Sequence, residues 1–292
     1  MKFVYGRDKE MSTPTPFIEV NDLVYTYADG TNALRGINMS ISEGEFIAFI
    51  GQNGSGKTTL SKCLNGLFKP TSGMVIVDGL DSRKTPIVQM VKRVGYVFQN
   101  PDHQLFNSNC WDEIAYGPRN IQLPEEEVKA RVAEAAQVVG LKESYFTEHP
   151  FFLNKGMRQR VAIASILALK PKVIIVDEPT TGQDIRQSLE IMDFLRDLNE
   201  NYGHIIIFVT HDMPIVSSYA KRVVAMGLGQ IIADGSPAEV FSHPDLLAKT
   251  YVEPPQITEL AQRINDLGFY PGTLSVNEML EQFEKLCRGN ET

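Results

Sequence analysis

The sequence predicts an α/β fold in which a mainly parallel β-sheet carries helices on both faces. Two observations indicate this fold. Short apolar runs alternate with longer stretches of helical periodicity, and a glycine-rich loop joins one such run to a helix-compatible stretch. Alternating strands and helices favour a parallel sheet, because parallel strands need a crossover connection that is usually a helix. The chain of 292 residues, 43% of them hydrophobic, is long enough for one large domain and a small appendage.

The N-terminal part is expected to contain antiparallel strands. Residues 1–16 end in Ser-Thr-Pro-Thr-Pro and are expected to form a flexible lead-in. Apolar and polar residues then alternate between turn-like segments, which predicts an antiparallel β subdomain. Its strands are expected at Phe17–Val20, Leu23–Tyr27 and Ile37–Ile41, and further strands at Phe46–Ile50, Met74–Val77 and Val94–Phe98.

Helical patterns dominate the middle of the chain, so residues about 100–169 are expected to form an α-helical subdomain. Apolar residues recur at helical spacing over Glu125–Val139 and Gly156–Leu169, and Pro124 stands where a helix starts. The strand and helix patterns then alternate again. We expect strands at Lys172–Val176 and Ile205–Val209, a helix at Gln183–Asn199, and a hairpin of Val223–Met226 with Gln230–Ala233.

A boundary is expected near Pro254-Pro255. Residues 252–292 then form a small C-terminal tail with helices at Ile257–Leu267 and Val276–Cys287. A helical cap packed on the main domain is favoured over a separate functional module.

Composition excludes several classes of protein. The net charge of −8 argues against a nucleic-acid-binding surface. The three cysteines are few and far apart, which argues against a disulfide framework or a metal cluster. No apolar run approaches the roughly 20 residues of a membrane-spanning helix, and no signal-peptide pattern is visible. If the protein works at a membrane, other chains are expected to hold it there.

The segment Gly51-Gln-Asn-Gly-Ser-Gly-Lys-Thr58 reads as a phosphate-binding loop. It follows an apolar strand and precedes a helix, which is the context this motif requires. Glycines allow backbone N–H groups to point at one anion, Lys57 can reach the β- and γ-phosphates, and the Thr58 hydroxyl can bind Mg²⁺. The candidate nucleotide-binding residues here are Gly51, Asn53, Gly54, Ser55, Gly56, Lys57, Thr58 and Thr59.

A second candidate motif is the apolar run Val173–Val176, which ends in Asp177 and Glu178. Asp177 is expected to hold Mg²⁺, directly or through water, and Glu178 to orient or deprotonate the attacking water. The alternative is a strand followed by a solvated acidic turn. ATP is favoured over GTP, because the Asn154-Lys155 pair lacks the aspartate of an Asn-Lys-x-Asp guanine reader.

Together these motifs resemble the nucleotide-binding subunit of ATP-binding-cassette (ABC) transporters. The resemblance implies an ABC-type ATPase domain over residues 17–251 that uses ATP and Mg²⁺. It also implies four site residues. Tyr27 stacks on adenine, Gln99 contacts Mg²⁺ and a transmembrane partner, Asp184 lies in a loop that crosses a dimer interface, and His211 contacts the γ-phosphate. The alternatives are an ordinary cross-strand aromatic for Tyr27 and an uninvolved residue after a strand for His211.

The segments Phe98–Phe106 and Glu113–Gly117 resemble those of energy-coupling-factor transporter ATPases, which power import of vitamins, cobalt or nickel. This resemblance implies a peripheral subunit at the cytoplasmic face of the cell membrane. Its implied partners are a second ATPase, a coupling membrane protein and a substrate-binding membrane protein, with no nucleic acid. The alternatives are another class of ABC transporter, a non-transport ABC ATPase, and an ATP sensor without turnover.

One segment departs from the family pattern. Where the family signature reads Leu-Ser-Gly-Gly-Gln, this chain has Leu153-Asn154-Lys155-Gly156-Met157. The resemblance implies that this segment binds the ATP held by the opposite subunit. Intact residues in the chain's own site beside an altered signature favour a heterodimer, while a homodimer and harmless sequence drift are the alternatives.

Overall fold

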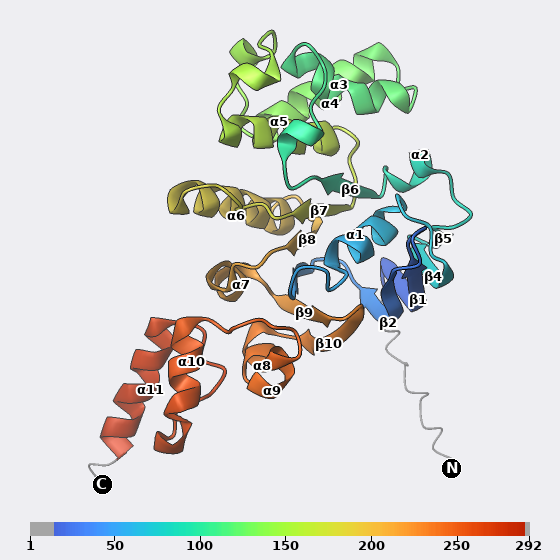
Figure 1. The fold of residues 1–292 in the computed structure, drawn as a ribbon. Coiled ribbons are helices and arrows are strands. Elements are labelled where there is room, and N and C mark those ends of the chain that lie inside the picture. The colour runs from blue at the N-terminus through green and yellow to red at the C-terminus, as the bar shows by residue number, and fades with distance from the viewer. Residues whose placement is uncertain (1–14, 290–292) are drawn as a thin grey trace, which may run out of the picture.

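The computed structural model describes residues 15–289, so the predicted lead-in lies outside the described residues except at its last two positions. A central sheet is flanked by an antiparallel sheet, a helical region and a C-terminal tail (Figure 1). The central sheet has the strand order β10-β9-β3-β8-β7-β6, and its neighbouring strands are parallel except β9 with β10. Its strands are β3 (Phe46–Ile50), β6 (Val94–Val97), β7 (Val173–Asp177), β8 (Ile205–Val209), β9 (Arg222–Gly227) and β10 (Gln230–Gly235).

Two hydrophobic cores lie on opposite faces of this sheet, because successive strand side chains point to opposite faces. Ile47 and Phe49 belong to the core shared with the antiparallel sheet. Phe46 and Ala48 belong to the core shared with the helical region. All residues of β3, β7 and β8 are buried, as is typical of parallel strands covered on both faces. The helices beside these strands are α1 (Lys57–Asn65), α6 (Ile185–Glu200) and α7 (Met213–Tyr219).

The antiparallel sheet has the order β2-β1-β4-β5 and corrects one prediction. Phe17–Val20 and Leu23–Tyr27 are not separate strands, because β1 runs without a break over Ile18–Thr26. The register shifts between Val20 and Leu23, where Asp22 has a φ of 46°, so a bulge within one strand joins the two predicted strands. The other strands are β2 (Asn32–Ile41), β4 (Ser72–Val77) and β5 (Leu80–Asp81).

The helical region lies beyond β6 and contains one helix that the sequence pattern did not predict. This helix is α3 (Cys110–Asn120), whose first turn is capped by the Asn109 side chain and whose last turn contains Pro118. Its neighbours are α4 (Glu125–Val138) and α5 (Lys155–Leu167). The short helix α2 (Ile87–Met90) precedes β6. Within the helical region, 3-10 turns lie at Pro101–His103, Glu143–Tyr145 and Pro150–Phe152.

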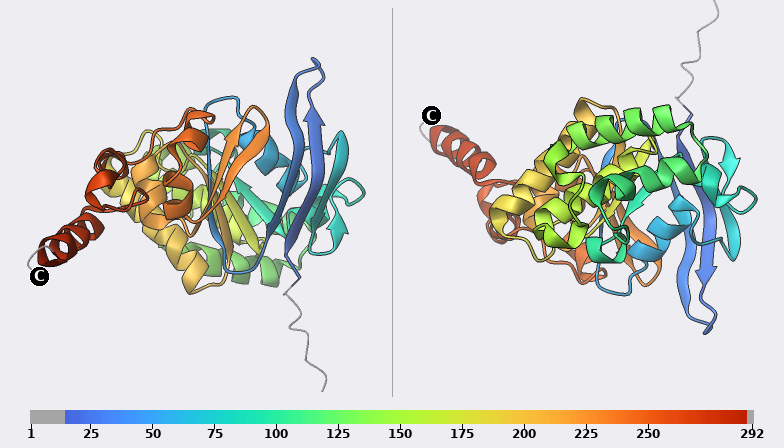
Figure 2. Two further views of the ribbon diagram at one scale, coloured as in Figure 1. Left: turned by 90° about the horizontal axis from the view of Figure 1, so that it is seen from below. Right: turned by 90° about the horizontal axis from the view of Figure 1, so that it is seen from above.

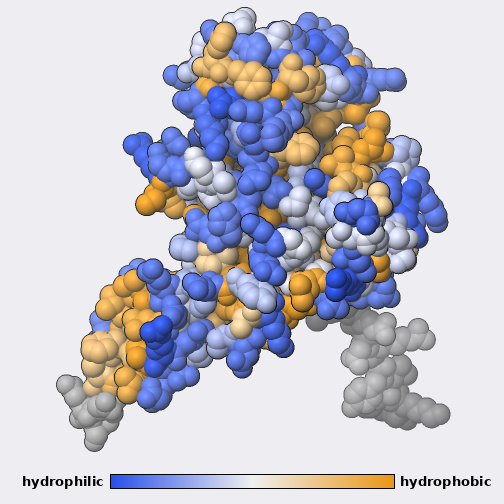
Figure 3. Space-filling view, viewed as in Figure 1, coloured by the Kyte–Doolittle hydropathy of each residue, from blue (hydrophilic) through white to orange (hydrophobic). Residues whose placement is uncertain are grey.

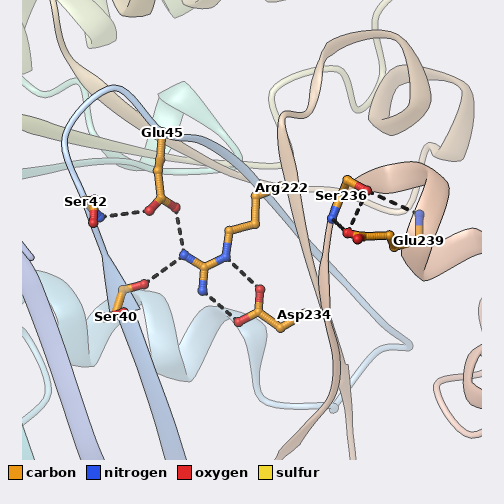
Figure 4. A network of polar contacts seen from close by, with 7 residues as sticks. All are labelled: Ser40, Ser42, Glu45, Arg222, Asp234, Ser236 and Glu239. Atoms are coloured by element: carbon orange, nitrogen blue, oxygen red, sulfur yellow. Dashed lines mark hydrogen bonds and ion pairs between the residues drawn. The ribbon is translucent and has the colours of Figure 1, made fainter. Parts of the chain in front are cut away.

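An ion-pair network at the start of β9 holds the entry to β3, the strand that leads into the phosphate loop (Figure 4). The Arg222 guanidinium contacts Asp234 at 2.6 Å and Glu45 at 2.8 Å. It also donates to the carbonyl oxygen of Ser40. The hydrogen bonds to Asp234 raise the pKa of Arg222, so the guanidinium stays charged. The network therefore ties β10, β9, β2 and the residue before β3 together.

The C-terminal part contains α8 (Pro237–Phe241), α9 (Pro244–Ala248), α10 (Gln256–Arg263) and α11 (Val276–Gly289). The helix predicted over Ile257–Leu267 ends at Arg263, and a 3-10 turn over Asn265–Leu267 follows it. α10 contacts the main body, where Gln262 donates to the carbonyl oxygen of Phe241. α11 extends away from the body (Figure 2).

Apolar side chains lie exposed along this tail (Figure 3). They are Leu260, Leu267, Tyr270, Val276, Leu280 and Phe283. None of the helices within residues 15–289 has the length and apolar character needed to cross a membrane.

Candidate nucleotide-binding site

The phosphate loop occupies residues 51–56, between the end of β3 at Ile50 and the start of α1 at Lys57. Gly56 precedes the helix with a φ of 107°, and no side chain caps this helix. A Cβ on Gly56 would lie 2.8 Å from the carbonyl oxygen of Ala33, so the position requires glycine for its φ and for close packing. The first N–H groups of α1 therefore have no competing side-chain acceptor, which suits an anion-binding helix end.

Lys57 is 8% exposed and lies beneath this loop. Its ammonium donates to the carbonyl oxygens of Gly51 at 2.7 Å and Gln52 at 2.9 Å. Burial lowers the pKa of Lys57, while the nearby carboxylates of Glu178 and Asp177 act in the opposite direction. The ammonium is thus held between the loop and the two acidic residues at the end of β7.

Asp177 ends β7 and is 7% exposed. Its Oδ2 atom accepts hydrogen bonds from the Tyr96 hydroxyl at 2.7 Å and the Thr58 hydroxyl at 3.2 Å. Burial raises the pKa of Tyr96, and the Asp177 charge adds to this effect, so the phenol remains a hydrogen-bond donor. The carboxylate is therefore fixed in orientation beside the first turn of α1.

The oxygen atoms of Thr58 and Asp177 fit a magnesium site. Mg²⁺ prefers hard oxygen ligands and is usually bound by one or two carboxylates together with substrate phosphates. Within residues 15–289 no group of three or more His, Cys, Asp or Glu side chains could hold a metal without such phosphates. The Thr58–Asp177 pair next to a phosphate loop meets the requirement, with the phosphates as the missing ligands.

Glu178 follows Asp177 in a left-handed backbone conformation, with a φ of 50°. This conformation is costly for a non-glycine residue, by about 1–3 kcal/mol, and recurs at functional sites. The carboxylate lies 2.9 Å from His211 Nδ1 and accepts a hydrogen bond of 2.9 Å from the Thr181 hydroxyl. The Glu178 side chain is 12% exposed and that of His211 is 70% exposed. A carboxylate held in this way can accept a proton from a water molecule in the adjoining cavity.

Two cavities meet at the carboxyl ends of the central strands, where ligands of open α/β sheets bind. The smaller has a volume of about 440 Å³ and contains both Asp177 and Glu178. Of the predicted nucleotide-binding residues, it is lined by Tyr27, Asn53, Gly54, Gly56, Lys57, Thr58 and Thr59. The Tyr27 hydroxyl is hydrogen-bonded to the Thr59 hydroxyl at 2.9 Å.

The larger cavity, of about 770 Å³, lies on the other side of the loop and is lined by Gly51 and His211. Gln99 and Glu178 line both cavities. Ser55 belongs to the loop itself but is buried, with 1% of its surface exposed. The cavity is also bordered by residues 251–256, which lead into the C-terminal tail.

The predicted signature residues and Asp184 do not line either of these cavities. Asn154 caps α5 and accepts a hydrogen bond from the Met157 N–H at 2.9 Å. Asp184 caps α6 in the same manner. Lys155 donates to the carbonyl oxygen of Thr181 at 2.7 Å. These residues therefore gather at the first turns of α5 and α6.

Sequence reasoning missed two residues of the site, Tyr96 and Thr181. A signal for Tyr96 exists, because it is the polar side chain in an apolar strand whose neighbour ends in Asp177, and it pairs with Ile175 in the parallel register. Thr181 follows Glu178 by three residues, within reach of a turn, but no pattern singles out its hydroxyl. Sequence reasoning also missed a contact between distant segments, in which the N–H of Gln52 donates to the carbonyl oxygen of Thr250 at 3.1 Å.

Comparison with known proteins identifies the family. Residues 34–181 match the family model described as "ABC transporter". The chain is 42% identical, over 94% of its length and 88% of the relative's, to the energy-coupling factor transporter ATP-binding protein EcfA of Methanothermobacter thermautotrophicus. A relative from Caldanaerobacter subterraneus, named as an ABC transporter ATP-binding protein, is 48% identical over 94% of the chain. The chain spans about half (47%) of that relative's length.

Two solved structures share the fold. One is cbiO1 from Clostridium perfringens, described as part of the ABC transporter complex cbiONQ. It is 39% identical with a TM-score of 0.72, over 84% of this chain and 98% of that one. The other is the ATP-binding cassette MJ0796, dimeric and bound to ADP and phosphate. It is 28% identical with a TM-score of 0.67, over 75% of this chain and 98% of that one.

Proposed function

Because the chain belongs to the ABC transporter family of ATPases, we propose that it hydrolyses ATP to power an energy-coupling-factor type importer. The similarity to EcfA and to cbiO1 at about 40% identity supports this class. The cargo is a vitamin or a transition-metal ion, and a separate membrane subunit recognises it. The chain is a peripheral subunit at the cytoplasmic face of the membrane.

One observation carries the proposal: Lys57, Asp177 and Glu178 converge on a single cavity beside an uncapped helix N-terminus. The loop amides and Lys57 hold the β- and γ-phosphates of ATP, and Tyr27 stacks on the adenine. Glu178 orients and deprotonates the attacking water. His211, 2.9 Å from Glu178, stabilises negative charge that develops on the γ-phosphate.

Magnesium, when bound, neutralises phosphate charge. Its protein ligands are the Thr58 hydroxyl and Asp177, directly or through water. Gln99 would contribute as well, because it lines the same cavity as Asp177. Tyr96 keeps Asp177 turned toward Thr58 through its 2.7 Å hydrogen bond.

The working unit is a dimer of ATPase subunits, with a heterodimer favoured. Asn154, Lys155, Gly156 and Asp184 lie outside the chain's own nucleotide cavity, which supports a role toward the nucleotide of a second subunit. The dimeric MJ0796 cassette shows that this fold assembles in pairs. Closure of the pair on ATP is a ligand-driven shift between open and closed populations.

An apolar groove of about 290 Å³ supports a membrane partner. It lies between α2, the end of β6, α3 and α5, and its apolar lining includes the exposed side chains of Ile87, Val88, Phe106 and Tyr116. Gln104 also lines it, so the Phe98–Phe106 segment borders both the groove and the nucleotide cavity through Gln99. We propose that a helix of the coupling membrane protein docks here.

The test is to express the full chain with the membrane proteins encoded beside its gene and with a second ATPase. Mg–ATP turnover by the purified complex, exceeding that of the lone chain, is the expected result. A lone chain that is fully active as a homodimer contradicts the heterodimer. Recovery in the soluble fraction without any integral membrane protein supports a non-transport ABC ATPase instead, and binding of ATP without single-turnover hydrolysis supports an ATP sensor.

A further inference from the structure

The first residue of α5, Lys155, links the helical region to the loop after the central strand β7. Its ammonium donates a 2.7 Å hydrogen bond to the carbonyl oxygen of Thr181, 26 positions further along the chain. The same nitrogen lies so close to Gly182 that a Cβ there would be 2.7 Å away. The ammonium thus lies against two consecutive residues of that loop, Thr181 and Gly182.

The loop residue held by Lys155 is also the residue that holds Glu178. The Thr181 hydroxyl donates to Glu178 Oε2 at 2.9 Å, and the Thr181 N–H donates to the carbonyl oxygen of Glu178 at 3.3 Å. Glu178 is in the left-handed conformation and contacts His211. A continuous series of polar contacts therefore runs from Lys155 through Thr181 to Glu178 and His211.

Apart from the bond donated by Lys155, the hydrogen bonds that restrain residues 179–183 come from within the same turn. Gly182 has a φ of 70°, and glycine is the residue with the greatest backbone freedom to lose. Besides the two hydrogen bonds between Thr181 and Glu178, the turn is held by Gln183. Its side-chain amide donates to the carbonyl oxygen of Pro179 at 3.0 Å, and its N–H donates to that of Thr180 at 3.2 Å. A charged donor from another element restrains such a turn more strongly than a bond within it, because charge-assisted hydrogen bonds are roughly twice as strong as neutral ones.

We propose that Lys155 is a positioning residue for Glu178, acting through Thr181. The inference rests on the proposed hydrolytic function, in which Glu178 activates water, and it assigns a role to the residue that departs from the family signature. Lys155 does not touch the smaller cavity, so its effect on hydrolysis is indirect. Because α5 belongs to the helical region and Glu178 follows a strand of the central sheet, a movement between these parts makes or breaks the link.

The central experiment compares three variants of the full chain, assayed as the ATPase complex with saturating Mg–ATP. Lys155→Met removes the ammonium but keeps the length of the side chain, Lys155→Arg keeps a cation, and Lys129→Met removes an exposed lysine of α4. We expect Lys155→Met to lower kcat about tenfold with an unchanged KM, because a well-placed general base contributes on the order of 10²–10⁴-fold. Lys155→Arg restores most of kcat, and Lys129→Met has no effect.

A second measurement does not depend on turnover. Amide hydrogen exchange of the peptide covering residues 178–184 reports the order of the loop. Lys155→Met is expected to increase exchange in this peptide, while Lys129→Met and Lys155→Arg leave it near the wild-type rate. Equal exchange in wild type and Lys155→Met overturns the proposal, whatever the kinetics show.

A double-mutant cycle separates positioning from a general loss of stability. Thr181→Val removes the hydroxyl that reaches Glu178, so its effect on kcat and that of Lys155→Met should be less than additive if both act along one path. Fully additive effects, or a wild-type kcat in Lys155→Met, contradict the inference. Failure of the proposed function looks different: the wild-type complex itself then shows no Mg–ATP hydrolysis, while the exchange measurement still reports on Lys155.

Discussion

The first turns of α1 and α5 resemble each other but serve different purposes. Each helix begins with a lysine, Lys57 or Lys155, whose ammonium donates to backbone carbonyl oxygens. The residue before the helix differs. Gly56 offers α1 no side-chain cap, whereas Asn154 caps α5 by accepting from the Met157 N–H.

This difference decides what each helix end can bind. The amides of α1 stay available to an anion, and Lys57 lies under the loop next to Asp177 and Glu178. In α5 the N–H of Met157 already donates to the Asn154 side chain, and the Lys155 ammonium donates to the loop after β7. We therefore expect the lysine at the helix start to bind an anion in α1 and to hold a neighbouring loop in α5, and the residue before the helix is the first indicator of which role applies.

The largest expected effect concerns the acid that the first helix faces. Glu178→Gln should retain ATP binding but lower kcat by on the order of 10²–10⁴-fold, because the amide cannot take the proton of the attacking water. Steady-state turnover and nucleotide-binding titrations measure the two quantities separately. Glu200→Gln, an exposed position on α6, is the control. Near wild-type turnover in Glu178→Gln would show that this residue is not the general base.

Next in size is the loss of the lysine of α1. Lys57→Ala should weaken Mg–ATP binding by about 10- to 100-fold, as expected when a charged hydrogen-bond donor worth about 1.5–3 kcal/mol is lost. Calorimetry on the full chain checks this. Lys62→Ala is the matched control, because Lys62 lies on the same helix with its ammonium 5.3 Å from the centre of the Phe68 ring. If Lys155→Ala reduced the chain's own ATP affinity equally, the contrast between the helices would fail.

The buried faces of the two helices also differ, since α1 carries Cys63 and the buried residues of α5 include no ionisable side chain. Burial raises the pKa of the Cys63 thiol from 9.0 to about 12. The folded state thus keeps this proton where the unfolded state loses it, so its contribution to stability is complete below pH 9 and is lost as pH rises toward 12.

We therefore expect Cys63→Ala to flatten the fall in unfolding free energy above pH 9, by up to about 1.4 kcal/mol per pH unit. Urea unfolding at several pH values measures the slope. Part of the fall remains, because burial also raises the pKa of Cys110, to about 11. Cys287→Ala, at an exposed position, should change nothing. An unchanged slope in Cys63→Ala would show that the thiol ionises without unfolding.

The smallest effect concerns the cap of α5. Asn154→Ala should lower the free energy of unfolding by about 1 kcal/mol, the usual loss when a capping side chain is removed. Asn109→Ala, which removes the equivalent cap of α3, should have a similar effect on stability. Thermal unfolding measures both. Only Asn154→Ala is expected to change the turnover of the two-subunit complex, and equal turnover in the two variants would argue that α5 has no role at a nucleotide.

Features with a local cause were predictable from the sequence. Apolar runs predict the central strands, and the glycines predict the phosphate loop. The predicted bounds of both therefore agree with the structure within a residue or two. The continuity of β1 was not predictable, because Asn21-Asp22 are residue types typical of turns, and only the structure shows that Asp22 adopts its left-handed conformation in a bulge. Pro118 concealed α3 in the same way, since proline usually marks the end of a helix.

Contacts between distant segments escaped prediction for a different reason. The hydrogen bond from Tyr96 to Asp177 depends on the register of two strands that are 81 positions apart in sequence. The bond from Lys155 to Thr181 depends on how α5 lies against the sheet, and the signature comparison suggested a binding role for Lys155 rather than an internal one. A single sequence contains no direct record of such pairings.

The backbone N–H of Gln52 donates a hydrogen bond to the carbonyl oxygen of Thr250, a fully buried residue. This hydrogen bond ties the predicted phosphate loop to a residue just before the C-terminal tail. A truncation made for crystallisation or labelling should therefore end downstream of Thr250. A shorter chain would lose the hydrogen bond that restrains the predicted phosphate loop.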